Sequence, residues 1–178
     1  MWAYWLLFLV PAGIAFSPIK GDKNVQYMMW FIVGLLGILL IGLRYQVGGD
    51  WTTYLGSLQD AEIGGVLEMR GLTSGYLYYL LNLLAIQLGL GISQGIYFIN
   101  LICGAITMVG LIKYCQKQPM PWMALTVAVP YLICIVAMGY TRQALALGFF
   151  LWGLSVLRIG SEGKFIGLIF LGTLFHLS

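Results

Sequence analysis

Three short polar stretches interrupt an otherwise apolar chain of 178 residues, and they hold the side chains best suited to chemistry. The first runs from Arg44 to Tyr54, the second is Arg142-Gln143, and the third is His176. Because a charged side chain at membrane depth costs about 2.5–3.5 kcal/mol, a sequence that keeps one there needs a reason. The three stretches are therefore the first candidates for a functional site.

In the first stretch, Arg44 and Asp50 flank the pair Gly48-Gly49. An arginine forks onto phosphate oxygens, and an aspartate accepts a proton or a sugar hydroxyl. Glycines let backbone N–H groups approach a ligand closely. The alternative is an interfacial loop anchored by Trp51, because the aromatic residues around it are typical of a membrane-interface belt. The GxxxxGK[ST] pattern is absent, so the stretch is not a P-loop.

The second and third stretches each have two interpretations. Arg142 is either an anion clamp or an arginine that extends towards water from a tight helix turn. His176 is the only histidine of the chain. Its ordinary pKa near 6.5 suits a general base or a phosphate ligand, whereas a lone histidine on an apolar helix also serves as a hydrogen-bonded packing residue. The residues alone do not choose between these interpretations.

The composition restricts the class of protein. The chain is 61% hydrophobic and 8% charged, whereas soluble domains carry about 25% charged residues. Lipid is therefore the expected solvent for most of its surface. Its net charge of +3 comes from basic residues scattered at segment ends, which does not indicate a nucleic-acid partner. Neither the three isolated cysteines nor the acidic residues have the spacing of metal ligands, so we expect no metal and no cofactor.

The apolar segments predict an all-α protein, a polytopic transmembrane bundle of about six or seven helices. We expect a single integral membrane domain over residues 1–178, with an external loop at 44–70 and a short interfacial helix from Trp51 to Leu58. The first helix is short and bends at Pro11. The apolar segments run over residues 1–16, 25–43, 71–88, 93–112, 121–138, 143–157 and from 165 onward.

The basic residues restrict the topology. If Lys20 and Lys23 lie in the cytoplasm, the loop at 44–70 lies outside. Two further crossings would place Lys113 and Lys117 on the outer face, against the positive-inside rule. A re-entrant or interfacial segment within residues 71–112 would return every basic pair to the cytoplasm and bring Arg142 to the outer face, with the third stretch beside it. The alternative is seven simple crossings with a weak charge bias.

The three stretches resemble the motifs of one family. Residues 44–54 resemble the R-x3-G-x-D-x3-Y motif that opens the EpsG family, and Arg142-Gln143 resembles its RQ-x-x-A helix start. Phe175-His176-Leu177-Ser178 resembles its FH-x-S motif, and order and approximate spacing also agree. Members are bacterial inner-membrane proteins of exopolysaccharide, capsule and O-antigen loci, and many are regarded as Wzy-like polymerases. They are typically about twice this long, so the resemblance implies the N-terminal part of a longer polymerase-like domain.

The resemblance implies a glycosyltransferase reaction that polymerises polyprenyl-diphosphate-linked oligosaccharide units. It implies a multi-pass protein of the bacterial cytoplasmic membrane that acts on the outer face, beside other polysaccharide-biosynthesis membrane proteins. Two alternatives stay open: a transporter or flippase of a lipid-linked glycan, and a non-catalytic subunit of a polysaccharide synthase complex. The residues that match the motifs and are expected to take part are Asp50, Arg142 and His176 in catalysis, and Arg44, Gly48, Tyr54 and Gln143 in substrate or diphosphate binding.

Overall fold

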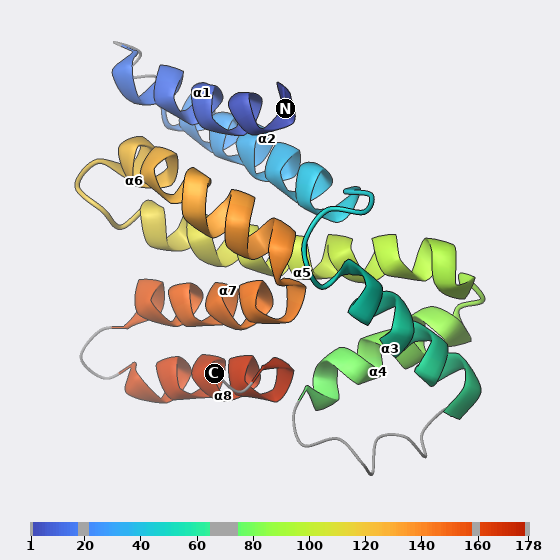
Figure 1. The fold of residues 1–178 in the computed structure, drawn as a ribbon. Coiled ribbons are helices and arrows are strands. Elements are labelled where there is room, and N and C mark those ends of the chain that lie inside the picture. The colour runs from blue at the N-terminus through green and yellow to red at the C-terminus, as the bar shows by residue number, and fades with distance from the viewer. Residues whose placement is uncertain (1, 18–21, 65–74, 158–160, 177–178) are drawn as a thin grey trace.

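A computed structural model describes residues 2–17, 22–64, 75–157 and 161–176, and all regular structure within these ranges is helical (Figure 1). The prediction of an all-α fold is therefore confirmed. The elements are α1 (Trp2–Phe16), α2 (Lys23–Gly42), α3 (Trp51–Gly64), α4 (Tyr76–Gln87), α5 (Gly91–Cys115), α6 (Pro121–Ala128), the π-helical segment η2 (Val129–Ala137), α7 (Thr141–Val156) and α8 (Glu162–Phe175).

Two of the described helices are long and apolar enough to cross a membrane, namely α2 with 20 residues and α5 with 25. At 1.5 Å per residue they extend for about 30 Å and about 38 Å, which matches a hydrocarbon core of about 30 Å. α1, α4 and the continuous run 121–137 are apolar but shorter. The bundle of six or seven transmembrane helices therefore stays a prediction.

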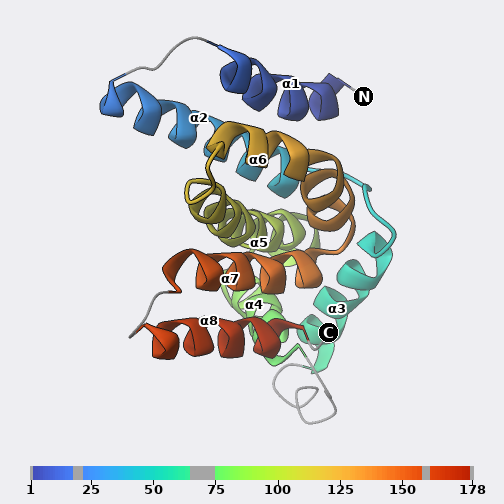
Figure 2. The same ribbon diagram turned by 90° about the vertical axis from the view of Figure 1, so that its left-hand side faces the viewer.

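α5 lies inside the bundle, with α2 on one side and α7 on the other (Figure 2). The α5–α7 pair is the most extensive contact between elements, and two glycines make it close. A Cβ built on Gly110 would overlap the carbonyl oxygen of Gly148, and one built on Gly148 would lie 2.7 Å from the Cα of Thr107. Small residues let helix backbones approach in this way. This close helix contact fixes α7, and with it Arg142-Gln143, against α5.

The predicted segment 121–138 is not one regular helix. It begins as α6 and continues as η2, which holds Pro130 at its second position. Proline has no N–H and its ring collides with the carbonyl four residues earlier, so the regular hydrogen-bond ladder is interrupted there. The rings of Trp122 and Trp30 stack at 3.7 Å with 10° between their planes, which ties α6 to α2. η2 ends at Ala137, directly before the turn that leads into α7.

The amphipathic helix predicted from Trp51 to Leu58 forms as part of α3, which continues to Gly64. Its apolar face packs against other helices of the protein, however. Trp51, Tyr54 and Leu58 are 8%, 2% and 0% exposed because they pack in one core cluster with residues of α4 and α5. An apolar stripe facing protein has the same spacing as one facing lipid, which explains the difference. Residues 65–70 of the predicted external loop, and 71–74 of the segment after it, lie outside the described residues.

The two ends of the bundle differ in their basic residues. α2 and α8 begin at the end where α1, α5 and α7 finish, and they finish at the opposite end, where α7 begins (Figures 1 and 2). The first, which we call the lysine end, holds Lys23, Lys113, Lys117 and Lys164. The second, which we call the motif end, holds Arg44, Asp50, Arg142 and His176.

Candidate functional site

Arg44 lies in the loop after α2, and its side chain is 6% exposed. Its Nη1 donates to the carbonyl oxygen of Ala137, and its Nη2 donates to the hydroxyl of Thr141. The Thr141 hydroxyl in turn donates to Oδ1 of Asn100 on α5, at 3.4 Å. Burial lowers the pKa of Arg44 from its ordinary value, yet a guanidinium stays charged at neutral pH. This side chain therefore fastens the loop to the start of α7.

Gly48 brings the backbone of the same loop against the turn before α7. Its φ is +102°, and a Cβ there would lie 2.5 Å from the carbonyl oxygen of Met138 and 2.9 Å from the Cα of Gly139. Glycine alone combines this conformation with so close an approach. A Cβ on the neighbouring Gly49 would have no heavy atom within 4 Å. Of the two glycines, the structure therefore requires only Gly48 for packing.

Arg142 lies at the start of α7, half-buried, with its guanidinium over two neighbouring aromatic rings. Its guanidinium carbon is 5.6 Å from the ring centroid of Tyr54 and 5.5 Å from that of Tyr78, and the two centroids are 5.5 Å apart. Aromatic faces attract a guanidinium by about 0.5–2 kcal/mol without neutralising it. Among the described residues, no carboxylate forms an ion pair with Arg142. Within the described part of the chain, aromatic side chains hold this positive charge without neutralising it.

Asp50 and Tyr54 lie one helical turn apart at the start of α3. The Tyr54 hydroxyl donates to Oδ2 of Asp50 at 3.4 Å. Burial raises the pKa of Tyr54, and the guanidinium of Arg142 opposes that shift. The hydroxyl therefore stays protonated and serves as a donor. Asp50 is half-buried and keeps acceptor capacity for a second proton or hydroxyl.

His176 reaches the same region from the end of α8. A Cβ built on Gly75, just before α4, would lie 3.4 Å from the carbonyl oxygen of Phe175 and 3.6 Å from Nη1 of Arg142. The backbone that ends α8 and the guanidinium of Arg142 therefore surround one glycine. His176 follows in an extended conformation, half-exposed. The structure thus brings the three motifs together from sequence positions more than 130 residues apart.

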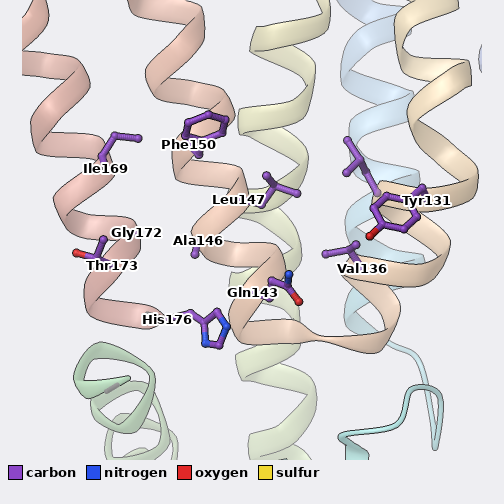
Figure 3. A pocket seen from close by; sticks show the side chains of 11 residues that line it. Tyr131, Val136, Gln143, Ala146, Leu147, Phe150, Ile169, Gly172, Thr173 and His176 are labelled. Atoms are coloured by element: carbon purple, nitrogen blue, oxygen red, sulfur yellow. The ribbon is translucent and has the colours of Figure 1, made fainter. Parts of the chain in front are cut away.

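An open groove of about 430 Å³ leads away from this region between η2, α7 and α8 (Figure 3). Gln143 and His176 lie at one end of it, and Phe150 and Ile169 lie further along. Gln143 and Phe150 are seven positions apart in α7, which corresponds to about 10 Å along the helix. Apart from Thr173, the remaining lining is mostly apolar, from Tyr131, Leu132, Val136, Ala146, Leu147 and Gly172. The groove is polar at the motif end and apolar beyond it.

The sequence did not point to three residues that shape the site, namely Tyr78, Asn100 and Thr141. Tyr78 falls in the apolar segment predicted at 71–88, but it is 2% exposed and lies beside Arg142. Asn100 is fully buried in α5, and a polar side chain inside so apolar a helix was a usable signal. Thr141 directly precedes the predicted Arg142 motif but belongs to no motif itself.

Comparison with known families agrees with the motifs. The model of the EpsG family matches residues 27–178, a range that contains all three stretches. The curated proteins and the solved structures hold no significant match to the chain. Together with the apolar helices α2 and α5, the family match identifies a membrane protein related to exopolysaccharide biosynthesis. The chain belongs to the EpsG family.

Proposed function

We propose that this protein polymerises polyprenyl-diphosphate-linked oligosaccharide units by glycosyl transfer at the outer face of the bacterial cytoplasmic membrane. One observation carries the proposal: Arg142, which forms no ion pair with a carboxylate among the described residues, directly precedes Gln143, and Gln143 and His176 line one end of a mostly apolar groove. The proposed substrate has the same order of polar and apolar parts as the groove, because its diphosphate joins a sugar to a long apolar tail. The groove receives the part of the tail nearest the diphosphate.

The reaction transfers a glycan from one lipid carrier to a sugar hydroxyl at the end of another. The hydroxyl oxygen attacks the anomeric carbon, the bond from that carbon to the diphosphate oxygen breaks, and the electron pair remains on the leaving diphosphate. A base removes the hydroxyl proton, and Asp50 or His176 takes this role. Arg142 stabilises the charge that develops on the diphosphate. At about 4 Å and an effective dielectric near 20, one such contact is worth about 4 kcal/mol.

Arg44 has a different part in this proposal from the one that its motif implies. Its two terminal nitrogens already donate to Ala137 and Thr141, and its side chain is buried. Its remaining N–H donors, Nε among them, are enclosed with the side chain, so a diphosphate could reach them only if the loop moved. We therefore assign Arg44 to positioning: it holds Thr141, and through it the adjacent Arg142, in place. Tyr54 positions Asp50 in the same way.

The proposed topology places the motif end outside and the lysine end in the cytoplasm. α4 has 12 residues and is about 18 Å long, too short for a hydrocarbon core of about 30 Å. A re-entrant or interfacial α4 between two full crossings, α2 and α5, satisfies the positive-inside rule for Lys23, Lys113 and Lys117. The same arrangement puts Arg142 and His176 on the outer face.

The test is an Arg142→Gln substitution in the whole protein, in cells that make the polysaccharide. We expect loss of polymer and accumulation of single lipid-linked units, because the leaving diphosphate loses its cation. Lys117→Gln, which removes the same charge at the lysine end, is the matched control and should leave polymer length unchanged. Polymer of normal length from the Arg142→Gln protein would refute the proposal.

Purified protein with a lipid-linked oligosaccharide separates the remaining functions. A polymerase joins two units into one product, whereas a transporter or flippase leaves each unit chemically unchanged. A non-catalytic subunit would tolerate alanine at Asp50, Arg142 and His176 in cells, while substitutions on its packed helix faces would abolish polymer formation. Each result assigns the protein to one of three classes: polymerase, transporter or flippase, or non-catalytic subunit.

A further inference from the structure

The lysine end contains a hollow of about 460 Å³ where α5 and α7 finish and α8 begins. Lys113, Lys117 and Lys164 line it together with Gln116 and Ser155. A second hollow of about 390 Å³ shares Gln116 and Lys117 with the first and adds Lys23 of α2. Among the described residues, no carboxylate lines either hollow. Four lysines from three helix ends therefore line two adjacent hollows, and no carboxylate of the described residues lines either of them.

The helix dipoles add to this positive charge, while Asp22 and Glu162, which line neither hollow, lie at the same two helix starts. Lys23 and Lys164 lie in the first turns of α2 and α8, where the positive end of the helix dipole disfavours a cation. The N-cap side chains, Asp22 and Ser161, make no capping hydrogen bond to the N–H groups of those turns. Lys113 is held over the ring of Trp152, at 5.4 Å from the centroid. An anion in the hollow would relieve the repulsion among these charges.

The position of the hollow indicates where the anion comes from. α2 begins and α5 ends here, and these are the described helices that are long and apolar enough to cross a membrane. Their ends lie where the hydrocarbon gives way to lipid headgroups. Basic pockets between transmembrane helices on the cytoplasmic side bind anionic headgroups. We infer that the lysine-lined hollow binds the headgroup phosphate of an anionic phospholipid, independently of the proposed glycosyl transfer.

Spin-labelled lipids test this inference on the whole protein in nanodiscs. Electron spin resonance gives the association constants of phosphatidylglycerol and phosphatidylcholine for the protein surface. We expect wild-type protein to prefer phosphatidylglycerol more than fivefold, and Lys117→Gln to reduce that preference about fivefold, the equivalent of about 1 kcal/mol for one lysine at a charged surface. Lys113→Gln and Lys164→Gln should each act in the same direction.

Three controls make the result decisive. The triple Lys→Arg variant at positions 113, 117 and 164 should keep the preference, because it keeps the charge, and circular dichroism verifies that each variant stays helical. Excess inorganic phosphate at constant ionic strength should not displace the lipid. Equal association of both lipids with wild-type protein, an unchanged preference in all three Lys→Gln variants, or displacement by inorganic phosphate would each overturn the inference.

Discussion

The motif end and the lysine end hold cations in opposite ways. Arg44 is buried, with both terminal nitrogens bonded to fixed partners, and Arg142 is held over two neighbouring rings. Lys117 and Lys164 are exposed at the other end. A guanidinium is planar and orients its donors, whereas an ammonium is a compact charge on a flexible stem. The difference indicates that the direction of the hydrogen-bond donors matters at the motif end, whereas only the sign of the charge matters at the lysine end.

The largest expected effect on stability comes from Arg44→Leu. It removes two hydrogen bonds from a charged donor and leaves buried acceptors on Ala137 and Thr141. Since each such bond is worth about 1.5–3 kcal/mol, we expect the free energy of unfolding to fall by about 3 kcal/mol or more. Chemical denaturation in detergent measures it. Arg44→Lys keeps the charge but lacks the planar pair of N–H donors. Full stability in that variant would contradict the claim that Arg44 acts through directed hydrogen bonds.

Gly48→Ala should have the next largest effect. The new Cβ would meet the Met138 carbonyl at a φ that disfavours side chains, and we expect a loss of about 2 kcal/mol in the free energy of unfolding. Gly49→Ala is the matched control, because its Cβ would have no neighbour within 4 Å. Equal unfolding curves for the two variants would show that the loop does not lie against the turn before α7.

Arg142→Gln should separate stability from activity. Its guanidinium contacts two rings without an ion pair among the described residues, so we expect the free energy of unfolding to fall by only about 1 kcal/mol. Polymer formation should nevertheless be lost. A variant that unfolds as readily as Arg44→Leu would mean that Arg142 supports the fold, and its effect on polymer would then say nothing about chemistry.

Tyr78→Phe should raise stability slightly. The Tyr78 hydroxyl is buried and has no hydrogen-bond partner among the described residues, while its ring contacts Arg142. Removing an unpaired buried hydroxyl should increase the free energy of unfolding by about 1 kcal/mol and keep the cation–π contact. Tyr78→Leu is the companion variant, because it also removes the ring. A destabilised Tyr78→Phe protein would show that the hydroxyl is paired in the membrane.

Lys117→Gln should have the smallest effect on stability. An exposed lysine at the lysine end contributes within about 0.5 kcal/mol to the free energy of unfolding. Denaturation of this variant beside Arg44→Leu compares the two ends in one experiment. A loss as large as that of Arg44→Leu would remove the contrast between them.

Much of the fold could be predicted from the sequence because long apolar runs have few alternatives. The segment predicted at 25–43 is α2 at Lys23–Gly42, and the segment predicted at 93–112 lies within α5. The π-helical turn around Pro130 could not be predicted, because proline only shows that the regular ladder is interrupted and not how the chain adapts. The number of membrane crossings also depends on helix tilt and partners, which hydropathy does not report.

The candidate site could also be predicted from the sequence only in part. The motifs predicted which residues would gather, but not that Arg44 would be buried and Arg142 available. Both are arginines beside apolar helices, and only the tertiary partners, Thr141 for the one and Tyr78 for the other, distinguish them. Tyr78 and Arg142 lie far apart in the sequence, so no local pattern joins their side chains.

The sidedness of three exposed glutamines tests the central claim most directly. Gln46 and Gln143 lie at the motif end, and Gln116 lies at the lysine end. Each is replaced by cysteine in a chain without its three native cysteines, and intact cells receive a membrane-impermeant thiol reagent. We predict that positions 46 and 143 react in intact cells, whereas position 116 reacts only after permeabilisation. If position 143 instead reacts like position 116, the motifs do not share the outer face, and the single site proposed here is wrong.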